Sequence, residues 1–593
     1  APVHAWQRGE VSLFEAVFSN HSGPLGRPLS MLSFILSEIM GGGDPYAYKL
    51  GNLLLHLLNT AIVFLLTRRL LARVSDASHR QLLWTGITVA LFWAVHPIQV
   101  STVAYAIQRM AQISTLFTLL ALFAFAVGSA TTHTGNRRLL VFVLLPLLTV
   151  LAALGKENGL LVPAYCLALH VGWLGGNSTL STRETRVFFG AFLALPAMAM
   201  LLVLLTAPDT LIGGYRLRDF TLAERLLTEP RVLLDYLGSY LAPQLVTATV
   251  HMDDVVASTS LLSPASTAFA LLFWGLLLLA GWTQRRARPA LLGSTLFFLA
   301  GHAMESTLFP LELAFEHRNY LASLAIPLLV ATILLRSGRL SRLLARHRPT
   351  ATMLLAAGFL LVAGLTFLRA DEWSNRERLV QSAYSKRPDS MRARLDYAQL
   401  AIENGRFDLA DPIFAEMEQS KNARERFVGQ SYATLSQCLA GQPVDPNWAD
   451  RFANSAPTPL TLTELAIAKA FSDTSSAGLC TTIPVDELAV AFAAVADSGQ
   501  AHQPRTDTPV WQIRLLAAQS FERAGQRELA IRQARRSWEA SQGFAPTGIM
   551  LTRLLLAQGE KAKAWEVLDR LEEETAKGQY LLQQEIARLH QDG

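Results

Sequence analysis

Ionisable and aromatic polar residues recur at the ends of the apolar runs of this chain, and their types favour anion binding. Arginine suits a phosphate because its guanidinium can donate two parallel hydrogen bonds. Nearby carboxylates could serve as a general base or orient a metal ion. The candidates are Arg27, His96, Arg109, Lys156, Glu157, Arg231, Tyr236, Glu316, His317 and Arg318. This combination predicts a site for a phosphate or pyrophosphate head group at a membrane surface.

Each candidate also has a structural explanation. Lys156 and Glu157 lie in a "GKENG" corner, where pairing with neighbours could make a tight turn tolerable. Arg109 could extend to lipid head groups, and His96 precedes Pro97 and could simply end a helix. Glu316, His317 and Arg318 could form an ion-pair cluster at the start of a span. The joint clustering is more persuasive than any single member.

Three further segments carry candidates. Arg27 follows a turn and precedes an amphipathic run, and Arg231 could anchor an interfacial helix that also carries Tyr236. His251, Asp253 and Asp254 resemble part of a metal set, but this spacing alone is weak. No metal ligand is therefore assigned and no cofactor is firmly implied, although a divalent metal stays open.

Composition excludes several classes of protein. The 593 residues are 51% hydrophobic and only 17% charged, against about 25% charged in soluble chains. A net charge of +5 on so apolar a chain excludes a disordered or nucleic-acid-coating protein, so no nucleic-acid partner is expected. "GGG" at 41–43 lacks the context of a phosphate-binding loop.

The apolar residues concentrate before residue 368, in runs near the 20 or so residues that a spanning helix needs. The ten candidate spans lie near 46–72, 82–104, 107–130, 139–155, 157–176, 187–207, 265–283, 289–303, 321–335 and 351–368. We therefore predict an all-α polytopic bundle over 46–368, with a first outer loop at 1–45 bearing amphipathic helices and a long outer loop at 208–264.

Basic residues separate the connections between spans into two sets. One set holds sixteen basic residues against Asp76 and Glu184: Arg68, Arg69, Arg73, Arg80, Arg137, Arg138, Arg183, Arg186, Arg285, Arg286, Arg288, Arg336, Arg339, Arg342, Arg346 and Arg348. The alternate set is longer but holds only Arg109, Lys156, Arg216, Arg218, Arg225, Arg231 and Arg318. The positive-inside rule places the first set in the cytoplasm. Both the N-terminal segment and the C-terminal tail are then outside, and we expect a first span upstream of Ala1.

The tail at 369–593 reads as paired amphipathic helices. Gly525 and Gly559 lie 34 residues apart, the tetratricopeptide period, and a third copy surrounds Gly405. Such repeats bind peptides or proteins along a concave face, although a rigid cap or assembly surface is an equal alternative. In an outer compartment we predict a disulfide between Cys438 and Cys480, with two free buried thiols as the alternative. Cys166, inside a span, reads as packing.

These segments resemble a known family. "GRPLSMLSF", "YKLGNLLLHLLNTAIVFLL", "FWAVHPIQVSTVAYAIQRMAQISTLFTLLAL" and "GKENGLLVPA" resemble the membrane body of GT-C-type glycosyltransferases with tetratricopeptide tails. The vertebrate transmembrane-and-tetratricopeptide O-mannosyltransferases share this order, with "GR" where this chain has Gln108-Arg109. "TEPRVLLDYL" and "FEHRNYL" look more like the bacterial branch, which includes pilin glycosyltransferases. The resemblance covers about residues 20–330 and the type of tail.

The resemblance implies a polyprenyl-phosphate or diphosphate sugar donor, inverting transfer and an active site on the outer face. It carries binding roles over to Arg27, Arg109, Lys156, Glu157, Arg231, His317 and Arg318. The family's presumed catalytic carboxylates lie just after the first span, often as adjacent acids. Glu10, Glu15 and Asp44 match no such motif, so the general base is expected upstream of Ala1, with Asp253 and Asp254 as fallback candidates.

The sequence thus predicts a glycosyltransferase in a bacterial inner membrane, acting on a hydroxyl of a protein Ser or Thr at the periplasmic face. Its expected partners are the lipid-linked donor, a protein acceptor held by periplasmic repeats, and the bilayer. The alternative is a non-catalytic, membrane-anchored repeat scaffold for an envelope or secretion assembly. That alternative predicts no preference of buried charges for the outer face. A glycan ligase or polymerase is a third option, and it would need a cavity open to a long saccharide.

Overall fold

The computed structural model describes residues 2–9, 11–18, 20, 23–243, 249–338, 342, 346–574 and 580–592. Glu10 and Arg339 lie outside these ranges. The chain divides into two compact units, the first comprising Ala1–Gly9, Ala16–Tyr215 and Phe220–Ser390. The second comprises Glu10–Glu15, Arg216–Asp219 and Met391–Gly593. Within the described ranges the regular elements are helices, without a strand, which confirms the predicted all-α polytopic class.

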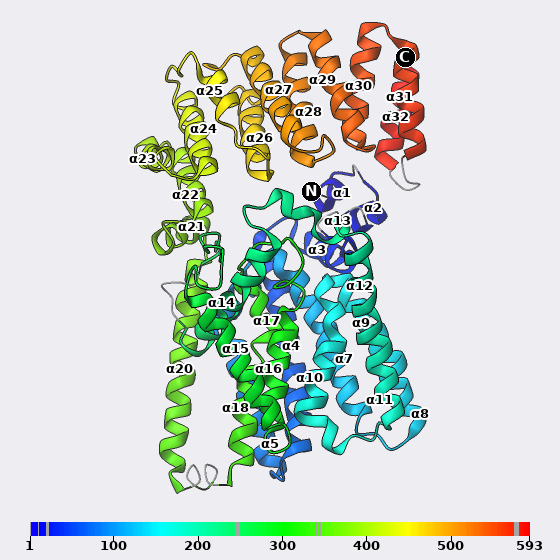
Figure 1. Cartoon of the computed structure of the whole chain (residues 1–593), viewed down its shortest axis with the longest axis vertical. Helices are drawn as coiled ribbons and strands as arrows, with labels where there is room; N and C mark the ends of the chain where they lie inside the picture. Colours follow the sequence, from blue (N-terminus) through cyan, green and yellow to red (C-terminus); the bar gives the residue numbers. More distant parts are fainter. Residues whose placement is uncertain are drawn as a thin grey trace. The chain divides into compact units, whose positions relative to one another are not determined.

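The first unit is a bundle of long apolar helices (Figure 1). In the described part of the chain, eight helical segments are long and apolar enough to cross a membrane. They are α4 (Pro45–Val74), Ala106–Gly128 with α7 (Arg109–Gly128), Thr134–Gly155 with α8 (Thr134–Arg138) and α9 (Leu145–Gly155), Glu157–Asn177 with α10 (Val162–Leu169), Thr182–Thr206 with α11 (Thr182–Phe189) and α12 (Leu195–Thr206), α15 (Ser266–Thr283), Glu316–Arg336 with α17 (Asn319–Ala322) and α18 (Ala325–Arg336), and α20 (Arg348–Glu372).

The two remaining predicted spans are helical but not single full-length helices. The segment predicted at 82–104 is a pair, α5 (His79–Val95) and Pro97–Ala104, bent by 53°. Pro97 has no N–H to continue the ladder and restricts the residue before it, and His96 is accordingly extended, with ψ 134°. The segment predicted at 289–303 is α16 (Pro289–His302), only 14 residues long, which is short for a full crossing.

A buried polar network joins α4 to its neighbours. Asn52, His56 and Asn59 share one face of α4 because they are four and three residues apart. His56 Nδ1 lies 2.8 Å from the Tyr320 hydroxyl, and Asn59 donates to the same hydroxyl at 3.2 Å. Trp93 of α5 donates to the Tyr320 carbonyl at 2.9 Å. In a bilayer the hydrophobic effect does not drive helices together, so side-chain hydrogen bonds of this kind help to hold spanning helices in contact. Here they also position Tyr320 near the start of the Glu316–Arg336 span.

The C-terminal unit is a series of helices connected by short turns (Figure 1). They are α22 (Met391–Glu403), α23 (Phe407–Glu418), α24 (Ala423–Leu439), α25 (Trp448–Ser455), α26 (Leu462–Ser476), α27 (Val485–His502), α28 (Thr508–Arg523), α29 (Arg527–Ala540), α30 (Ala545–Gln558), α31 (Lys561–Glu574) and α32 (Tyr580–Asp592). Gly525 and Gly559 adopt left-handed φ values of 74° and 82° between paired helices, a conformation that glycine adopts without strain.

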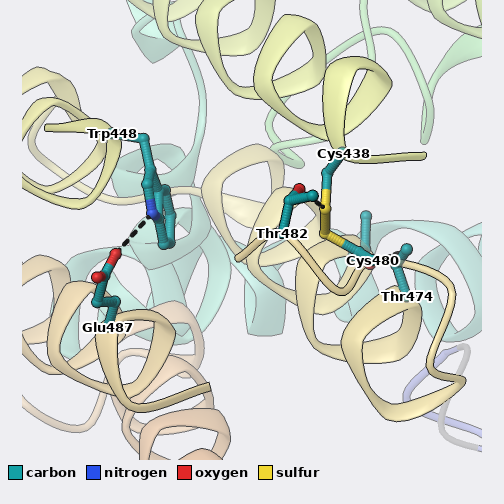
Figure 2. The surroundings of a disulfide bond; sticks show 7 residues. Cys438, Trp448, Thr474, Cys480, Thr482 and Glu487 are labelled. Carbon is teal, nitrogen blue, oxygen red and sulfur yellow. Dashed lines mark hydrogen bonds between the residues drawn. A yellow bond between two sulfur atoms is a disulfide. The ribbon is translucent and has the colours of Figure 1, made fainter. Parts of the chain in front are cut away.

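A disulfide joins Cys438, on α24, to Cys480, in the connection between α26 and α27 (Figure 2). It closes a loop with a sequence separation of 42 residues, which stabilises this unit by restricting the unfolded chain. Beside it, Trp448 donates to Glu487 at 3.0 Å and so links α25 to α27. Cys166, on α10, is buried and free.

Candidate functional site

The "GKENG" corner is held rigidly between two spans. The Gly155 carbonyl accepts a hydrogen bond from Ser30 at 2.8 Å, and the Lys156 carbonyl accepts one from Ser114 at 3.3 Å. A Cβ on Gly159 would lie 2.3 Å from the backbone of α9, so only glycine permits this close approach. The corner therefore fixes the backbone from which the Lys156 and Glu157 side chains project.

Lys156 belongs to a buried ionic cluster with Glu305 and Arg318. Lys156 Nζ lies 2.6 Å from Glu305 Oε1, and Arg318 Nε lies 3.4 Å from Glu305 Oε2. The three side chains are only 12%, 6% and 2% exposed. Burial by itself would raise the pKa of the Glu305 carboxyl, but the charges of Lys156 and Arg318 outweigh burial and hold that pKa well below its ordinary value. The Glu305 carboxylate is thus the negative charge that stabilises Lys156 and Arg318, two buried cations, next to each other.

Arg318 is oriented by the loop that precedes its own helix. Its Nη1 donates to the Leu313 carbonyl at 2.9 Å and its Nη2 to the Glu312 carbonyl at 2.6 Å. Lys156, His317 and Arg318 line one small cavity of about 40 Å³ together with Tyr165. This volume holds at most a few water molecules, so a sugar phosphate could enter only if side chains moved.

A second acid–base pair borders the cluster on α14 (Leu222–Leu241). Arg225, Glu229 and Tyr236 lie four and seven residues apart and form one buried face of this amphipathic helix. Arg225 pairs with Glu229 at 2.8 Å and also donates to the Glu305 carbonyl. Burial raises the pKa of Glu229 to about 7, although Arg225 and Arg318 oppose the shift. A carboxyl with this pKa can exchange a proton near neutrality.

Tyr236 connects α14 to the segment before Arg318. Its hydroxyl accepts a hydrogen bond from the Phe315 N–H at 2.7 Å, and its ring stacks on His302 with centroids 5.3 Å apart. Arg231 and Tyr236 contact different partners. Arg231 donates to the Val256 carbonyl and the Ser258 hydroxyl at 3.0 and 2.9 Å.

Glu157 faces Arg27 rather than the cluster. Arg27 donates from Nε and Nη2 to the Glu157 carboxylate at 3.1 and 2.8 Å, a bidentate pair. Arg27 has a left-handed backbone, with φ 52°, which is uncommon for a residue with a side chain. A Cβ on Gly23 would lie 2.0 Å from Glu157 Oε1, so a side chain at this position would have to displace the Glu157 carboxylate from Arg27.

The structure places the other predicted residues in separate contacts. Arg109 uses all three guanidinium nitrogens, on Asn52, Ser33, Ser37 and Tyr48. His96 stacks on Tyr240, with centroids 4.1 Å apart, and its Nε2 lies 3.0 Å from the Tyr240 carbonyl. Glu316 pairs with Arg369 at 3.0 Å. These contacts fasten α3 (Pro28–Gly41), α14 and α20 to the bundle.

The fallback bases are also occupied. Asp254 pairs with Arg387 at 2.5 Å, and Asp253 accepts a hydrogen bond from Ser390 at 2.6 Å. Among the described residues, no group of three or more His, Cys, Asp or Glu side chains could hold a metal ion.

Sequence reasoning missed Glu305, Glu229 and the structural role of Arg225. Glu305 lies in "GHAMESTLF", just after an apolar run, and a lone acid at the end of a predicted span was the available signal. Glu229 lies in "TEPRVLLDYL", four residues after Arg225, and this spacing predicts a pair on one helix face. The partners of Glu305 could not be found in this way, because Lys156 is 149 positions away.

Comparisons with known proteins give partial matches to protein O-mannosyl-transferases. The chain is 36% identical over 107 residues to Protein O-mannosyl-transferase Tmtc2 of Drosophila melanogaster, a stretch covering 18% of this chain and 10% of that protein. It is 32% identical over 165 residues to TMTC2 of Mus musculus, covering 28% of this chain and 19% of the relative. It is 35% identical over 140 residues to Tmtc1 of Drosophila melanogaster, covering 24% and 15%.

The matched stretches thus span less than a fifth of each of these relatives. No family model matches the chain, and no solved structure matches it.

Proposed function

We propose that this chain is a membrane glycosyltransferase that moves a sugar from a polyprenyl-phosphate-linked donor to a hydroxyl of an acceptor protein. The main observation behind the proposal is the buried ionic cluster in which Lys156 and Arg318 both pair with Glu305 beside the cavity. Two cations at the end of spanning helices suit the phosphate of a lipid carrier. The partial matches to protein O-mannosyl-transferases support the same class of reaction.

In this proposal the donor phosphate competes with Glu305 for the two cations. Lys156 and Arg318 bind phosphate oxygens, while His317 lines the same cavity and contacts the sugar or its bridging oxygen. Glu229 supplies a carboxyl that can gain or lose a proton near pH 7. The proposed setting is the periplasmic face of a bacterial inner membrane, with the C-terminal helices holding the acceptor.

A non-catalytic scaffold is the competing function, and one observation favours it. Arg27, Arg109 and Glu157 are satisfied by partners inside the protein, as expected of residues that only hold helices together. The two functions predict different results when the Lys156–Glu305 pair is replaced by neutral side chains: only the transferase loses an activity.

The test uses a double variant, Lys156→Gln with Glu305→Gln, because removing one charge of each sign leaves the net charge of the cluster unchanged. Arg318 loses Glu305 but keeps its hydrogen bonds to the Leu313 and Glu312 carbonyls. The purified chain is incubated with synthetic polyprenyl-phosphate sugars, and sugar release is measured together with the melting temperature. Arg378→Gln is the matched control, since Arg378 forms an exposed pair with Asp371 away from the cluster.

The proposal expects turnover by the wild type and the control, with at least a hundredfold loss in a double variant that still melts cooperatively. A hundredfold loss corresponds to about 2.7 kcal/mol of transition-state stabilisation. Turnover that merely follows the folded fraction would show that the cluster is not the site of transfer. Absence of both turnover and carrier binding in the wild type would favour the scaffold.

A further inference from the structure

A second charged pocket lies at the opposite end of the spans that carry the ionic cluster. The span Glu157–Asn177 begins next to Lys156, and the span Glu316–Arg336 begins next to Arg318. Each has 21 residues, about 30 Å of helix and about the thickness of the hydrocarbon core. Both end at a cavity of about 820 Å³ lined by Arg73, Arg285, Arg286, Arg336, Asp76 and His170, among others.

Among the described residues, the charges that line this pocket are not balanced. Four arginines face one carboxylate, that of Asp76. Within the described part of the chain, Arg286, Arg336 and Asp76 make no ion pair or side-chain hydrogen bond, and all three are exposed. Basic groups on several sides of one hollow raise the local concentration of anions.

One guanidinium nitrogen and one imidazole nitrogen in the lining of this pocket could donate or accept further hydrogen bonds. Arg73 Nε and His170 Nδ1 are buried, and neither has a hydrogen-bond partner among the described residues. Arg73 is oriented, since its Nη2 donates to the Asn177 carbonyl and the Asn177 amide donates back to the Arg73 carbonyl at 3.3 Å. Leaving a buried polar atom without a partner costs about twice what an ordinary hydrogen bond contributes to stability. The pocket therefore favours a ligand with several acceptor oxygens.

A tryptophan sets the depth of the pocket relative to the bilayer. The Arg285 guanidinium lies over the Trp282 ring, 4.0 Å from its centroid, and Arg285 Nη1 donates to the Trp282 carbonyl at 2.7 Å. Trp282 is 57% exposed at the end of α15. Exposed tryptophans at the ends of spanning helices lie at head-group level, so a lipid reaches this pocket more readily than a soluble anion.

We infer that this pocket binds the phosphate-bearing head group of an anionic phospholipid. Arg286 and Arg336 hold the phosphate oxygens, Arg73 and His170 bind from the inner wall, and the acyl chains lie along the apolar helices. This site is separate from the ionic cluster and does not depend on sugar transfer.

The experiment measures binding of short-chain phosphatidylglycerol to the purified full chain in detergent, by native mass spectrometry and by the rise in melting temperature. Phosphatidylcholine and inorganic phosphate are the comparison ligands. Arg286→Gln with Arg336→Gln removes two exposed, unpaired charges, so folding is expected to survive. Arg80→Gln is the matched control, because Arg80 is exposed at the start of α5 and does not line the pocket.

Phosphatidylglycerol is expected to bind the wild type and the Arg80→Gln control equally, and at least tenfold more tightly than phosphatidylcholine. Each arginine near a membrane surface raises the affinity for an anionic lipid about fivefold. The double variant should therefore bind phosphatidylglycerol roughly 25-fold more weakly. Equal binding of the two lipids, or an equal loss in the control, would overturn the inference. Inorganic phosphate that binds as tightly as the lipid would also overturn it, by identifying a site for a free anion.

Discussion

The two ends of the spans Glu157–Asn177 and Glu316–Arg336 both carry cations, but they differ in how those cations are buried and paired. At the first end, Lys156 and Arg318 are buried and share the Glu305 carboxylate. At the second end, Arg286 and Arg336 are exposed beside an open pocket and make no ion pair with the described residues, although Asp76 lines the same pocket. Burial makes an unpaired charge too costly, whereas an exposed arginine is stabilised by water or lipid. A ligand at the first end must therefore displace an internal partner, while a ligand at the second end supplies the missing one.

The largest expected effect comes from removing the shared counter-charge. Glu305→Gln leaves Lys156 and Arg318 buried without a carboxylate, and breaking a buried pair in this way costs roughly 3–5 kcal/mol. Thermal unfolding in detergent should show a large fall in melting temperature. Asp76→Asn at the other end is the control, because this exposed carboxylate makes no ion pair with the described residues. Similar melting temperatures for the two variants would contradict the contrast between the ends.

The next effect is a pH dependence that Glu229 gives to the buried end. Burial raises the pKa of Glu229 to about 7 from an ordinary 4.5, so the folded protein binds this proton more tightly than the unfolded chain. The resulting stabilisation is complete below about pH 4.5 and is lost as pH rises through 7, and it amounts to on the order of 3 kcal/mol. Glu305, whose pKa is lowered, has the opposite sign and contributes a change only at more acidic pH.

The measurement compares melting temperatures of the wild type and Glu229→Gln at pH 5, 6, 7 and 8. The wild type should lose stability across this window relative to the variant, whose amide cannot titrate. Arg225, Arg318, Glu305 and the Ser306 hydroxyl all act on Glu229, so a parallel pair of curves would mean that these neighbours keep it ionised throughout.

The contrast between the ends was only partly predictable from the sequence. Hydropathy predicted the spanning helices, and the positions of the arginines divided the connections into two sets, because both signals are local in the sequence. The "GKENG" corner was recognisable from its glycines and charges. The partners of those charges were not, since Lys156 meets Glu305 and Arg27 meets Glu157 across 149 and 130 positions. Arg109 and Arg318 look alike in the sequence, but one is held by four neighbours in the N-terminal helices and the other shares Glu305.

A neutral buried group tests whether burial or charge produces the effect at the first end. Tyr320→Phe removes the hydroxyl that lies 2.8 Å from His56 and accepts from Asn59. We expect a loss of about 1–3 kcal/mol, because the two partners stay buried without an acceptor or donor. Tyr46→Phe is the control, since Tyr46 is 68% exposed. A loss as large as that of Glu305→Gln would show that burial of any polar group, rather than of charge, controls this end.

The smallest effect should come from the ion pair at the arginine-rich end. Arg137 and Glu184 are 3.0 Å apart, and Glu184 also accepts a hydrogen bond from the Ser181 N–H at 2.9 Å in a capping box. Glutamine can still cap this helix, so Glu184→Gln removes the charge alone. Arg137 and Glu184 are partly buried, at 13% and 15% exposed, but both line an open pocket, so we expect a loss of about 1 kcal/mol. The loss should shrink further in high salt, which screens charges that water reaches, while the loss in Glu305→Gln should not. If Glu184→Gln instead costs as much as Glu305→Gln and is equally insensitive to salt, the ends do not differ in burial. The unbalanced arginines would then need a different explanation from access to lipid and water.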